Sequence, residues 1–167
     1  MDHITQIDSP LGMILLSSDG ESLTGLWFEG QKFFGSTLSD EHTEQHVPVL
    51  EQTELWLNQY FSGKEPDFTP PFSPAGTPFQ KTVWDLLLAI PYGQTVTYGD
   101  IAAEIAKQRG LDHFSSQAVG NAVARNPISI IIPCHRVIGA DGTLTGYAGG
   151  LERKKKLLSL EGSLLNM

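Results

Sequence analysis

The single cysteine of this chain stands beside two basic side chains. Cys134 follows Pro133 and precedes His135 and Arg136. A cysteine reacts as its thiolate, and cationic neighbours or the start of a helical turn favour that form. Pro133 suits the first position of such a turn, so we expect free backbone N–H groups beside Cys134. The setting indicates a nucleophile, whereas a lone cysteine more often serves as a small buried apolar residue.

A thiolate nucleophile needs a base, and a carboxylate commonly orients that base. His135 is the adjacent imidazole, but neighbours in sequence rarely point at each other, so we expect a water relay between His135 and Cys134. Glu161 ends the last predicted helix, where the negative helix end disfavours a carboxylate that has no partner. We therefore expect Glu161 to pair with His135; a solvated surface glutamate is the alternative.

The net charge is distributed unevenly along the 167 residues. The whole chain carries −8, but residues 1–74 carry −10, from two Lys and no Arg against twelve Asp and Glu. Residues 75–167 carry +2, so this half of the chain can approach a polyanion. The first half is either an acidic accessory region or one solvated acidic face.

The cysteine count and the hydropathy limit the class of protein. One cysteine excludes an intramolecular disulfide and any zinc site that needs several cysteines. No apolar run approaches the ~20 residues of a membrane span, and the first residues do not have the pattern of a signal peptide. We therefore expect a cytoplasmic protein with no metal site and no membrane partner.

The first half of the chain predicts a small antiparallel sheet with one helix. The strands are expected over residues 9–18 and 23–28, and the helix over residues 47–61. Five prolines between Pro66 and Pro78 then mark a linker. We expect an N-terminal α/β accessory domain over residues 1–74 and a second domain over residues 75–167.

The second half predicts mainly helices. They are expected over residues 78–90, 98–107, 117–125 and 151–161, with a buried strand over residues 128–132. The two helices between Thr97 and Arg125 have the pattern of a helix-turn-helix. The second has small side chains and no acid, so it can approach a DNA groove or, alternatively, pack closely within the core. The predicted fold class is α+β, with the cysteine in a mostly helical C-terminal domain.

The residues around the cysteine, Pro133-Cys134-His135-Arg136-Val137, resemble the active-site signature of the O6-alkylguanine-DNA alkyltransferases, or methylated-DNA–protein-cysteine methyltransferases. Other segments agree with this family in order and spacing: Pro91-Tyr92-Gly93, Thr97-Tyr98, Ala118-Val119-Gly120, Arg125-Asn126-Pro127, Gly146-Tyr147, Gly149-Gly150 and Leu160-Glu161-Gly162. The resemblance is strong over residues 75–162 and covers the first half only in general layout. It implies a ribonuclease-H-like N-terminal domain and a winged-helix-like C-terminal domain.

The resemblance also implies a reaction. Such a protein binds double-stranded DNA containing O6-alkylguanine in the minor groove and flips the damaged base into a pocket. Cys134 then takes the alkyl group irreversibly, so each molecule acts once. O4-alkylthymine is a second expected substrate. The resemblance implies no cofactor, and we expect a monomer.

The resemblance assigns roles to individual residues. His135 matches the base that deprotonates Cys134 through water, and Glu161 matches the carboxylate that orients it. Asn126 matches the hinge asparagine that links the recognition helix to the active-site strand. The expected pocket residues are Tyr98, which also assists base flipping, Val137, Tyr147, Ala148 and Gly149. The expected DNA contacts are Tyr98, Gln117, Ala118, Gly120, Asn121 and Arg125. Arg136 is expected to be structural and to pair with a carboxylate.

Two positions depart from the family pattern. Gln117 stands where well-known members have an arginine that fills the gap left by the flipped base. Ala148 stands where other members have a serine, whose hydroxyl lies near guanine O6. The cysteine-containing zinc site of some members cannot exist in this chain.

Three alternatives remain open at the level of the sequence. One is a non-catalytic alkyltransferase-like protein that binds lesions, although those proteins lack the cysteine. A second is a thiol hydrolase that uses Cys134 and His135 and shows turnover. A third is a DNA-binding regulator with a structural cysteine.

Overall fold

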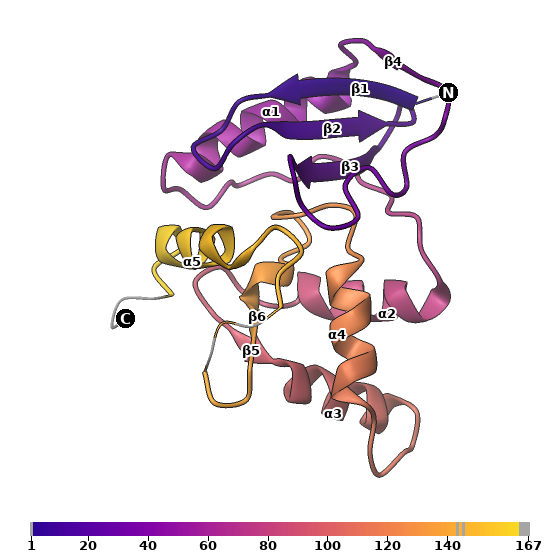
Figure 1. Ribbon diagram of the computed structural model, residues 1–167, viewed down its shortest axis with the longest axis vertical. Coiled ribbons are helices and arrows are strands. Elements are labelled where there is room, and N and C mark those ends of the chain that lie inside the picture. The colour runs from indigo at the N-terminus through magenta and orange to yellow at the C-terminus, as the bar shows by residue number, and fades with distance from the viewer. Residues whose placement is uncertain (1, 143, 145, 164–167) are drawn as a thin grey trace. The chain divides into compact units, whose positions relative to one another are not determined.

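The computed structural model describes residues 2–142, 144 and 146–163 (Figure 1). The chain divides into two compact units. The first contains the residues up to 75 together with 127–131, and the second contains residues 76–126 and those from 132 onward. The domains predicted over residues 1–74 and 75–167 remain a proposal.

The first unit contains a four-stranded sheet in the order β3-β2-β1-β4. Its strands are β1 (Asp2–Ile7), β2 (Ile14–Ser18), β3 (Leu23–Phe28) and β4 (His42–Glu44). The first three strands pair antiparallel, and β4 pairs parallel with β1. The strand predicted over residues 23–28 is confirmed. The one predicted over residues 9–18 begins only at Ile14, because backbone hydrogen bonds between Ser9 and Gly12 close a turn.

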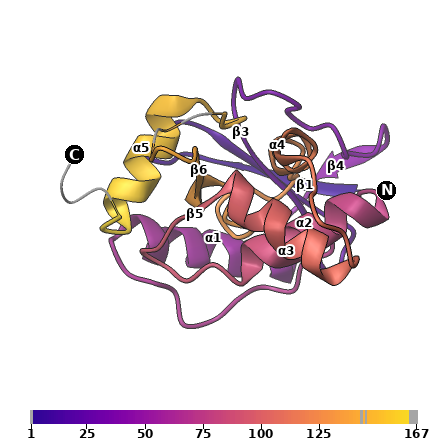
Figure 2. The ribbon, with the colours of Figure 1, turned by 90° about the horizontal axis from the view of Figure 1, so that it is seen from below.

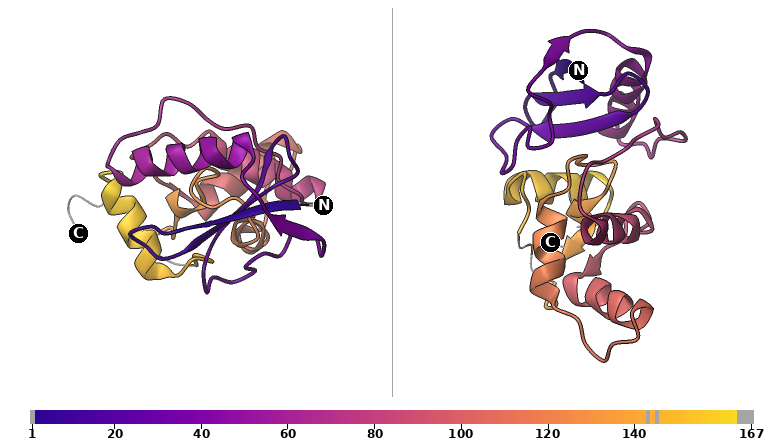
Figure 3. Two further views of the ribbon diagram at one scale, coloured as in Figure 1. Left: turned by 90° about the horizontal axis from the view of Figure 1, so that it is seen from above. Right: turned by 90° about the vertical axis from the view of Figure 1, so that its right-hand side faces the viewer.

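Helix α1 (Pro48–Phe61) packs on this sheet, as Figure 3 shows (left). The helix predicted over residues 47–61 is therefore confirmed. The apolar side chains between helix and sheet are fully or almost fully buried: Ile14, Leu16, Leu26, Phe28, Leu50, Leu57 and Tyr60. This burial of apolar area is the main stabilising contribution to the first unit.

The second unit is mostly helical, and Figure 2 shows its first three helices grouped together. Its helices are α2 (Pro78–Leu88), α3 (Tyr98–Gln108), α4 (Ser116–Ala124) and α5 (Leu151–Leu160). Two short strands, β5 (Val96–Thr97) and β6 (Val137–Ile138), pair parallel. All four predicted helices are confirmed, with ends within two residues of the expected ones. The α+β fold class is also confirmed.

Local capping explains why these helices begin where they do. Thr77 accepts a hydrogen bond from the backbone of Gln80, whose side chain accepts one in return, so α2 starts with a capping box. Thr97 and Asp100 form the same motif at α3. Ser115 caps α4 through the backbone N–H of Ala118. These caps are readable in the sequence, which is why the helix starts were predictable.

The buried strand predicted over residues 128–132 is wrong. Ile128 lies in an isolated bridge with Leu26 and not in a strand, and Ile130 has φ +71°, the left-handed conformation that ends an extended strand. The backbone N–H of Ile131 donates to the carbonyl of Ser129 at 2.8 Å, which makes the segment a tight turn. The run is nevertheless buried, and burial alone accounts for its apolar composition.

Of the helices in the described ranges, none is both long and apolar enough to cross a membrane.

Candidate active site

Cys134 opens a one-turn 3-10 helix, Cys134–Arg136, and is 4% exposed. Pro133 stands just before this helix and not at its first position. The backbone N–H of Cys134 donates to the carbonyl of Ile132 at 2.8 Å. Among the N–H groups that were expected to be free at this turn, that of Cys134 is therefore occupied, and that of Arg136 donates to the carbonyl of Pro133 at 3.0 Å.

Burial raises the pKa of the Cys134 thiol, which is opposite to the expectation that its setting favours the thiolate. Hydrogen bonding by Asn126 and Tyr147 and the charge of Lys154 offset this effect only in part. The resting group is a neutral thiol, so a nearby base must remove its proton before it can react.

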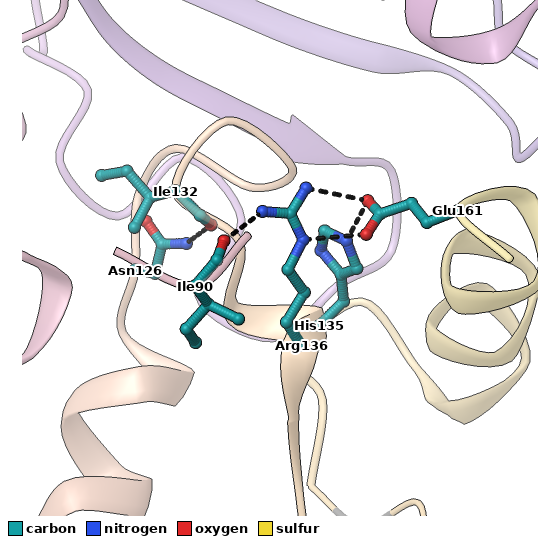
Figure 4. Close-up of polar contacts among 6 residues, drawn as sticks. All are labelled: Ile90, Asn126, Ile132, His135, Arg136 and Glu161. Carbon is teal, nitrogen blue, oxygen red and sulfur yellow. Dashed lines mark hydrogen bonds and ion pairs between the residues drawn. The ribbon is translucent and has the colours of Figure 1, made fainter. Parts of the chain in front are cut away.

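His135 and Glu161 form a buried pair, in which His135 Nε2 lies 2.7 Å from Glu161 Oε2 (Figure 4). The predicted pairing of Glu161 with His135 is thus present in the structure. Because Nε2 donates to the carboxylate, Nδ1 carries the lone pair of the neutral ring. Within the described residues, Nδ1 is buried and has no hydrogen-bond partner. Burial lowers the pKa of His135, so the ring is neutral and can accept a proton at Nδ1.

Arg136 pairs with the same carboxylate, which identifies the partner that the sequence could not name. Its Nε lies 2.8 Å from Glu161 Oε1 and its Nη2 lies 3.2 Å from Oε2. Its Nη1 donates to the carbonyl of Ile90 at 2.7 Å (Figure 4). Burial alone would raise the pKa of Glu161, but His135 and Arg136 outweigh it and lower that pKa to about 2.

Asn126 contacts both the backbone before Cys134 and the thiol itself. Its side-chain Nδ2 donates to the carbonyl of Ile132 at 2.7 Å, and the residue is 4% exposed. This hydrogen bond joins the end of α4 to the segment that leads into Cys134 (Figure 4). The side chain therefore joins the two ends of the five-residue turn 127–131 and also hydrogen-bonds the thiol.

The two tyrosines of the expected pocket each contact a glycine of the segment 146–149. Tyr98 is half-buried, and its hydroxyl donates to the carbonyl of Gly146 at 3.0 Å. Burial raises the pKa of Tyr98 to about 12, so it remains a neutral donor. Tyr147 is buried, and a Cβ at Gly149 would lie 2.5 Å from its ring, so only glycine fits there. Val137 is buried and Ala148 is half-buried.

Helix α4 presents one exposed face and one buried face. Val119, Ala122 and Val123 are buried, and the indole N–H of Trp84 donates to the carbonyl of Ala122 at 2.9 Å. The remaining expected contact residues are exposed or half-buried: Gln117, Ala118, Gly120, Asn121 and Arg125. Helices α3 and α4 contact each other, and the face of α4 that carries the expected contact residues is at least partly accessible to solvent.

Lys154 belongs to the site but was missed by the sequence analysis. It is fully buried, its Nζ donates to the carbonyl of Val137, and its charge acts on Cys134. Three consecutive lysines look like a solvated patch. The signal was the helical spacing of Lys154 with Leu157, Leu158 and Glu161, all buried.

A candidate metal site is not found: no group of three or more His, Cys, Asp or Glu in the described ranges is placed to hold an ion.

A helix-turn-helix unit that holds a buried thiol beside a histidine–glutamate pair has the features of a DNA-binding protein with a nucleophilic cysteine. Comparison with known proteins identifies the family within this class. The chain belongs to the 6-O-methylguanine DNA methyltransferase family. Residues 3–74 match its ribonuclease-like domain, and residues 78–163 match its DNA binding domain. The predicted family is confirmed.

Similar proteins cover almost the whole chain. A methylated-DNA–protein-cysteine methyltransferase of Haemophilus influenzae is 42% identical over 95% of this chain and 86% of its own length. A methylated-DNA–protein-cysteine methyltransferase of Methanosarcina acetivorans is 46% identical over 93% of this chain and 96% of its own length. The crystal structure of Mycobacterium tuberculosis OGT in complex with DNA is similar with a TM-score of 0.84 and 42% identity, over 96% of this chain and 93% of that one.

Proposed function

We propose that Cys134 accepts the alkyl group of O6-alkylguanine, and also of O4-alkylthymine, in double-stranded DNA. DNA repair by alkyl transfer to a protein cysteine is the function of this family, and its similar members carry that reaction in their names. Cys134 is the only cysteine of the chain, which supports it as the acceptor. The observation that carries the proposal is the orientation of His135 by Glu161, which leaves Nδ1, beside the residue that bears the thiol, without a hydrogen-bond partner among the described residues.

The proposed reaction begins with a proton transfer. His135 Nδ1 takes the thiol proton, through a water molecule, and Glu161 stabilises the imidazolium that forms. The sulfur then forms a bond to the alkyl carbon while the bond from that carbon to O6 breaks. The electron pair of the broken bond goes to guanine, which takes up a proton and leaves as the normal base. The thioether is not hydrolysed, so the reaction stops after one alkyl group and needs no cofactor.

The remaining residues hold the base and the chain in place. Asn126 fixes the segment between α4 and Cys134 through its bond to the carbonyl of Ile132. Tyr98, Val137, Tyr147, Ala148 and Gly149 are proposed to line the pocket for the flipped base. Tyr98 stays neutral, so its hydroxyl can donate to the leaving guanine once it exchanges the carbonyl of Gly146 for the base.

We propose that α4 enters the minor groove. Small side chains on its exposed face allow close approach to the DNA backbone, and α4 carries no acid that would repel phosphate. Gln117 is proposed to fill the gap left by the flipped base, beside Ala118, Gly120, Asn121 and Arg125. One chain per lesion suffices for this chemistry, so we propose a monomer that acts in the cytoplasm.

The test is the intact mass of the protein after incubation with a duplex that contains O6-methylguanine. The mass is expected to rise by one methyl group, mapped to the Cys134 peptide, and Cys134→Ser should abolish the rise. An unmodified duplex is the control, and a duplex with O4-methylthymine tests the second substrate. Repeated turnover without a mass change would instead indicate a hydrolase, and a lesion bound without any transfer would indicate a non-catalytic binder.

A further inference from the structure

Three side chains from separate segments of the second unit form a stack at the turn between α3 and α4. The guanidinium carbon of Arg109 lies 5.5 Å from the centre of the Phe79 ring and 5.4 Å from the centre of the Phe114 ring. The two ring centres are 5.5 Å apart, with their planes inclined at 35°. A guanidinium group and an aromatic ring attract each other at such distances, and so do two rings. We call Phe79, Arg109 and Phe114 the Arg109 stack.

Each member of the Arg109 stack stands at the boundary of a helix. Phe79 is the second residue of α2, Arg109 directly follows α3, and Phe114 directly precedes Ser115, which caps α4. The packing of the residue before an N-cap fixes the angle at which the chain enters a helix. Arg109 is exposed and both rings are half-buried, so the stack lies outside the hydrophobic core. It ties the entry into α4 to the start of α2.

The turn has little side-chain support from α3. A hollow of about 360 Å³ is lined by residues 111–114 of the turn and by small residues of α3, among them Gly99, Ala102 and Ala106. Small side chains leave the turn without close packing there. A surface segment with few packed contacts opens easily. The Arg109 stack therefore supplies side-chain contacts that α3 gives only in part.

Helix α2 also holds the other end of α4. The indole N–H of Trp84 donates to the carbonyl of Ala122 at 2.9 Å, and Trp84 is 1% exposed. Phe79 and Trp84 both belong to α2. One helix thus contacts the chain at the beginning and near the end of α4. Two such contacts fix the direction of α4 relative to α2, whereas the loss of one permits α4 to pivot.

We propose that the Arg109 stack positions α4 for DNA binding: it holds the turn before Ser115 against α2, so that Gln117 reaches the duplex in the orientation that base flipping needs. This inference rests on the proposed function, in which α4 enters the groove. The three members of the stack are positioning residues, because they act through α4. A duplex needs this orientation of α4, whereas a free base that enters the pocket does not.

The experiment compares variants that each remove one member of the stack. Phe114→Leu removes a ring but keeps apolar bulk, Arg109→Gln removes the cation, and Phe114→Tyr keeps the ring. Lys107→Gln is the matched control for Arg109→Gln, because it removes an exposed charge from the last turn of α3. If Phe114→Leu does not fold, Phe79→Leu replaces it.

Three quantities are measured for each variant. The first is the affinity for a DNA duplex over a range of salt concentrations. The second is the rate of alkyl transfer, from an O6-methylguanine duplex at limiting concentration and from free O6-benzylguanine. The third is backbone hydrogen exchange over residues 109–118 without DNA.

Phe114→Leu and Arg109→Gln should each weaken duplex binding about fivefold, and the double variant should lose less than the product of the two. Transfer from the duplex should slow by the same factor, whereas the rate with free O6-benzylguanine should not change. Phe114→Leu should leave the salt slope unchanged, and Phe114→Tyr should bind DNA within about twofold of the wild type. Hydrogen exchange over residues 109–118 should become about fivefold faster in Phe114→Leu.

Wild-type DNA affinity in Phe114→Leu would overturn the proposal. Equal losses in Arg109→Gln and Lys107→Gln would also overturn it, because Arg109 would then act through its charge on phosphate. Slower reaction of Phe114→Leu with free O6-benzylguanine would place the stack in the support of the pocket instead. Failure of the proposed function is a separate result. If the wild-type protein neither binds duplex nor takes a methyl group, that function fails, while hydrogen exchange still reports whether the stack orders the turn.

Discussion

Arg136 fixes Glu161, because its guanidinium group contacts both carboxylate oxygens while His135 occupies one of them. A carboxylate held from two sides cannot rotate away from the imidazole. The same guanidinium reaches the carbonyl of Ile90, just beyond α2. Arg136 therefore connects three segments that are distant in sequence and sets the direction of the His135 hydrogen bond.

Removal of this guanidinium should destabilise the protein. Arg136→Met leaves Glu161 buried without its cation, and breaking one side of such a pair costs about 3 kcal/mol or more of the free energy of unfolding. Arg136→Lys should recover only part of the loss, because an ammonium group cannot contact both oxygens. Urea denaturation measures the difference, with Lys81→Met as a control at an exposed lysine of α2. Equal stability of Arg136→Met and the wild type would contradict this assignment.

The free energy of unfolding should fall at acid pH, because Glu161 must then be protonated. Glu161→Gln removes this carboxylate and so isolates its contribution. The pKa of Glu161 falls from 4.5 to about 2 on folding, so its stabilising contribution is complete above pH 4.5 and is lost as the pH falls through 2. A decrease of this size corresponds to roughly 3 kcal/mol. His135 also lowers the stability as the pH falls below its ordinary pKa of 6.5. The unfolded chain takes up a proton at this imidazole there, whereas burial opposes its protonation in the folded state.

The measurement is the free energy of unfolding by urea at several pH values between about 7 and 2. The stability that Glu161→Gln loses relative to wild type should be constant above pH 6.5, where His135 is neutral in both proteins, and should shrink as the pH falls from 4.5 towards 2. A difference that does not depend on pH would mean that Glu161 acts through packing and not through its charge.

Gly149→Ala should slow alkyl transfer. The new methyl group would lie 2.5 Å from the Tyr147 ring, so the ring must move out of its place near Cys134. Single-turnover transfer from an O6-methylguanine duplex measures the effect, which we expect to be on the order of tenfold. Gly99→Ala is the control, because its methyl group would meet only Thr97, at an ordinary contact distance of 3.7 Å. Equal transfer rates for Gly149→Ala and Gly99→Ala would show that alkyl transfer does not require the Tyr147 ring in its present position.

Gln117→Arg should tighten binding to duplex DNA. Gln117 is exposed near the start of α4, and arginine adds a charge that a phosphate can contact. The binding free energy should improve by roughly 1 kcal/mol, and the slope of log affinity against log salt should steepen by about one unit. Gln117→Ala should slow repair of duplex DNA but not reaction with free O6-benzylguanine, which needs no base flipping. Equal slowing of both reactions would place Gln117 in the fold or the pocket.

Local signals made much of this structure predictable. Thr77 and Thr97 begin their helices through capping residues three positions away, and such motifs are visible in a sequence. The pairing of Glu161 with His135 was predictable, because a carboxylate at the C-terminal end of a helix needs a partner. By contrast, strand β1 was not predicted at all. Its pairing with β2 and β4 depends on residues far along the chain.

Two predictions near Cys134 were wrong, the strand over residues 128–132 and the favoured thiolate, and both depend on contacts with distant parts of the chain. The apolar run before the cysteine is compatible with a strand or a buried turn, and only the φ of Ile130 decides between them. The acidity of Cys134 depends on how deeply folding buries it, which no neighbouring residue reveals. Lys154 lies twenty residues beyond Cys134, so its sequence context gives no hint that the two interact.

The turn at residues 127–131 limits how this chain can be divided. Its residues belong to the first unit, where Pro127 accepts from the N–H of Leu26 and Ser129 donates to the carbonyl of Leu26. A protease cut in the proline-rich segment would therefore not yield two self-sufficient fragments, because the N-terminal one would lack five of its own residues. A version of the protein that is split into two fragments should therefore not be cut in this segment. If it is, residues 127–131 must be supplied by the second fragment when the two associate.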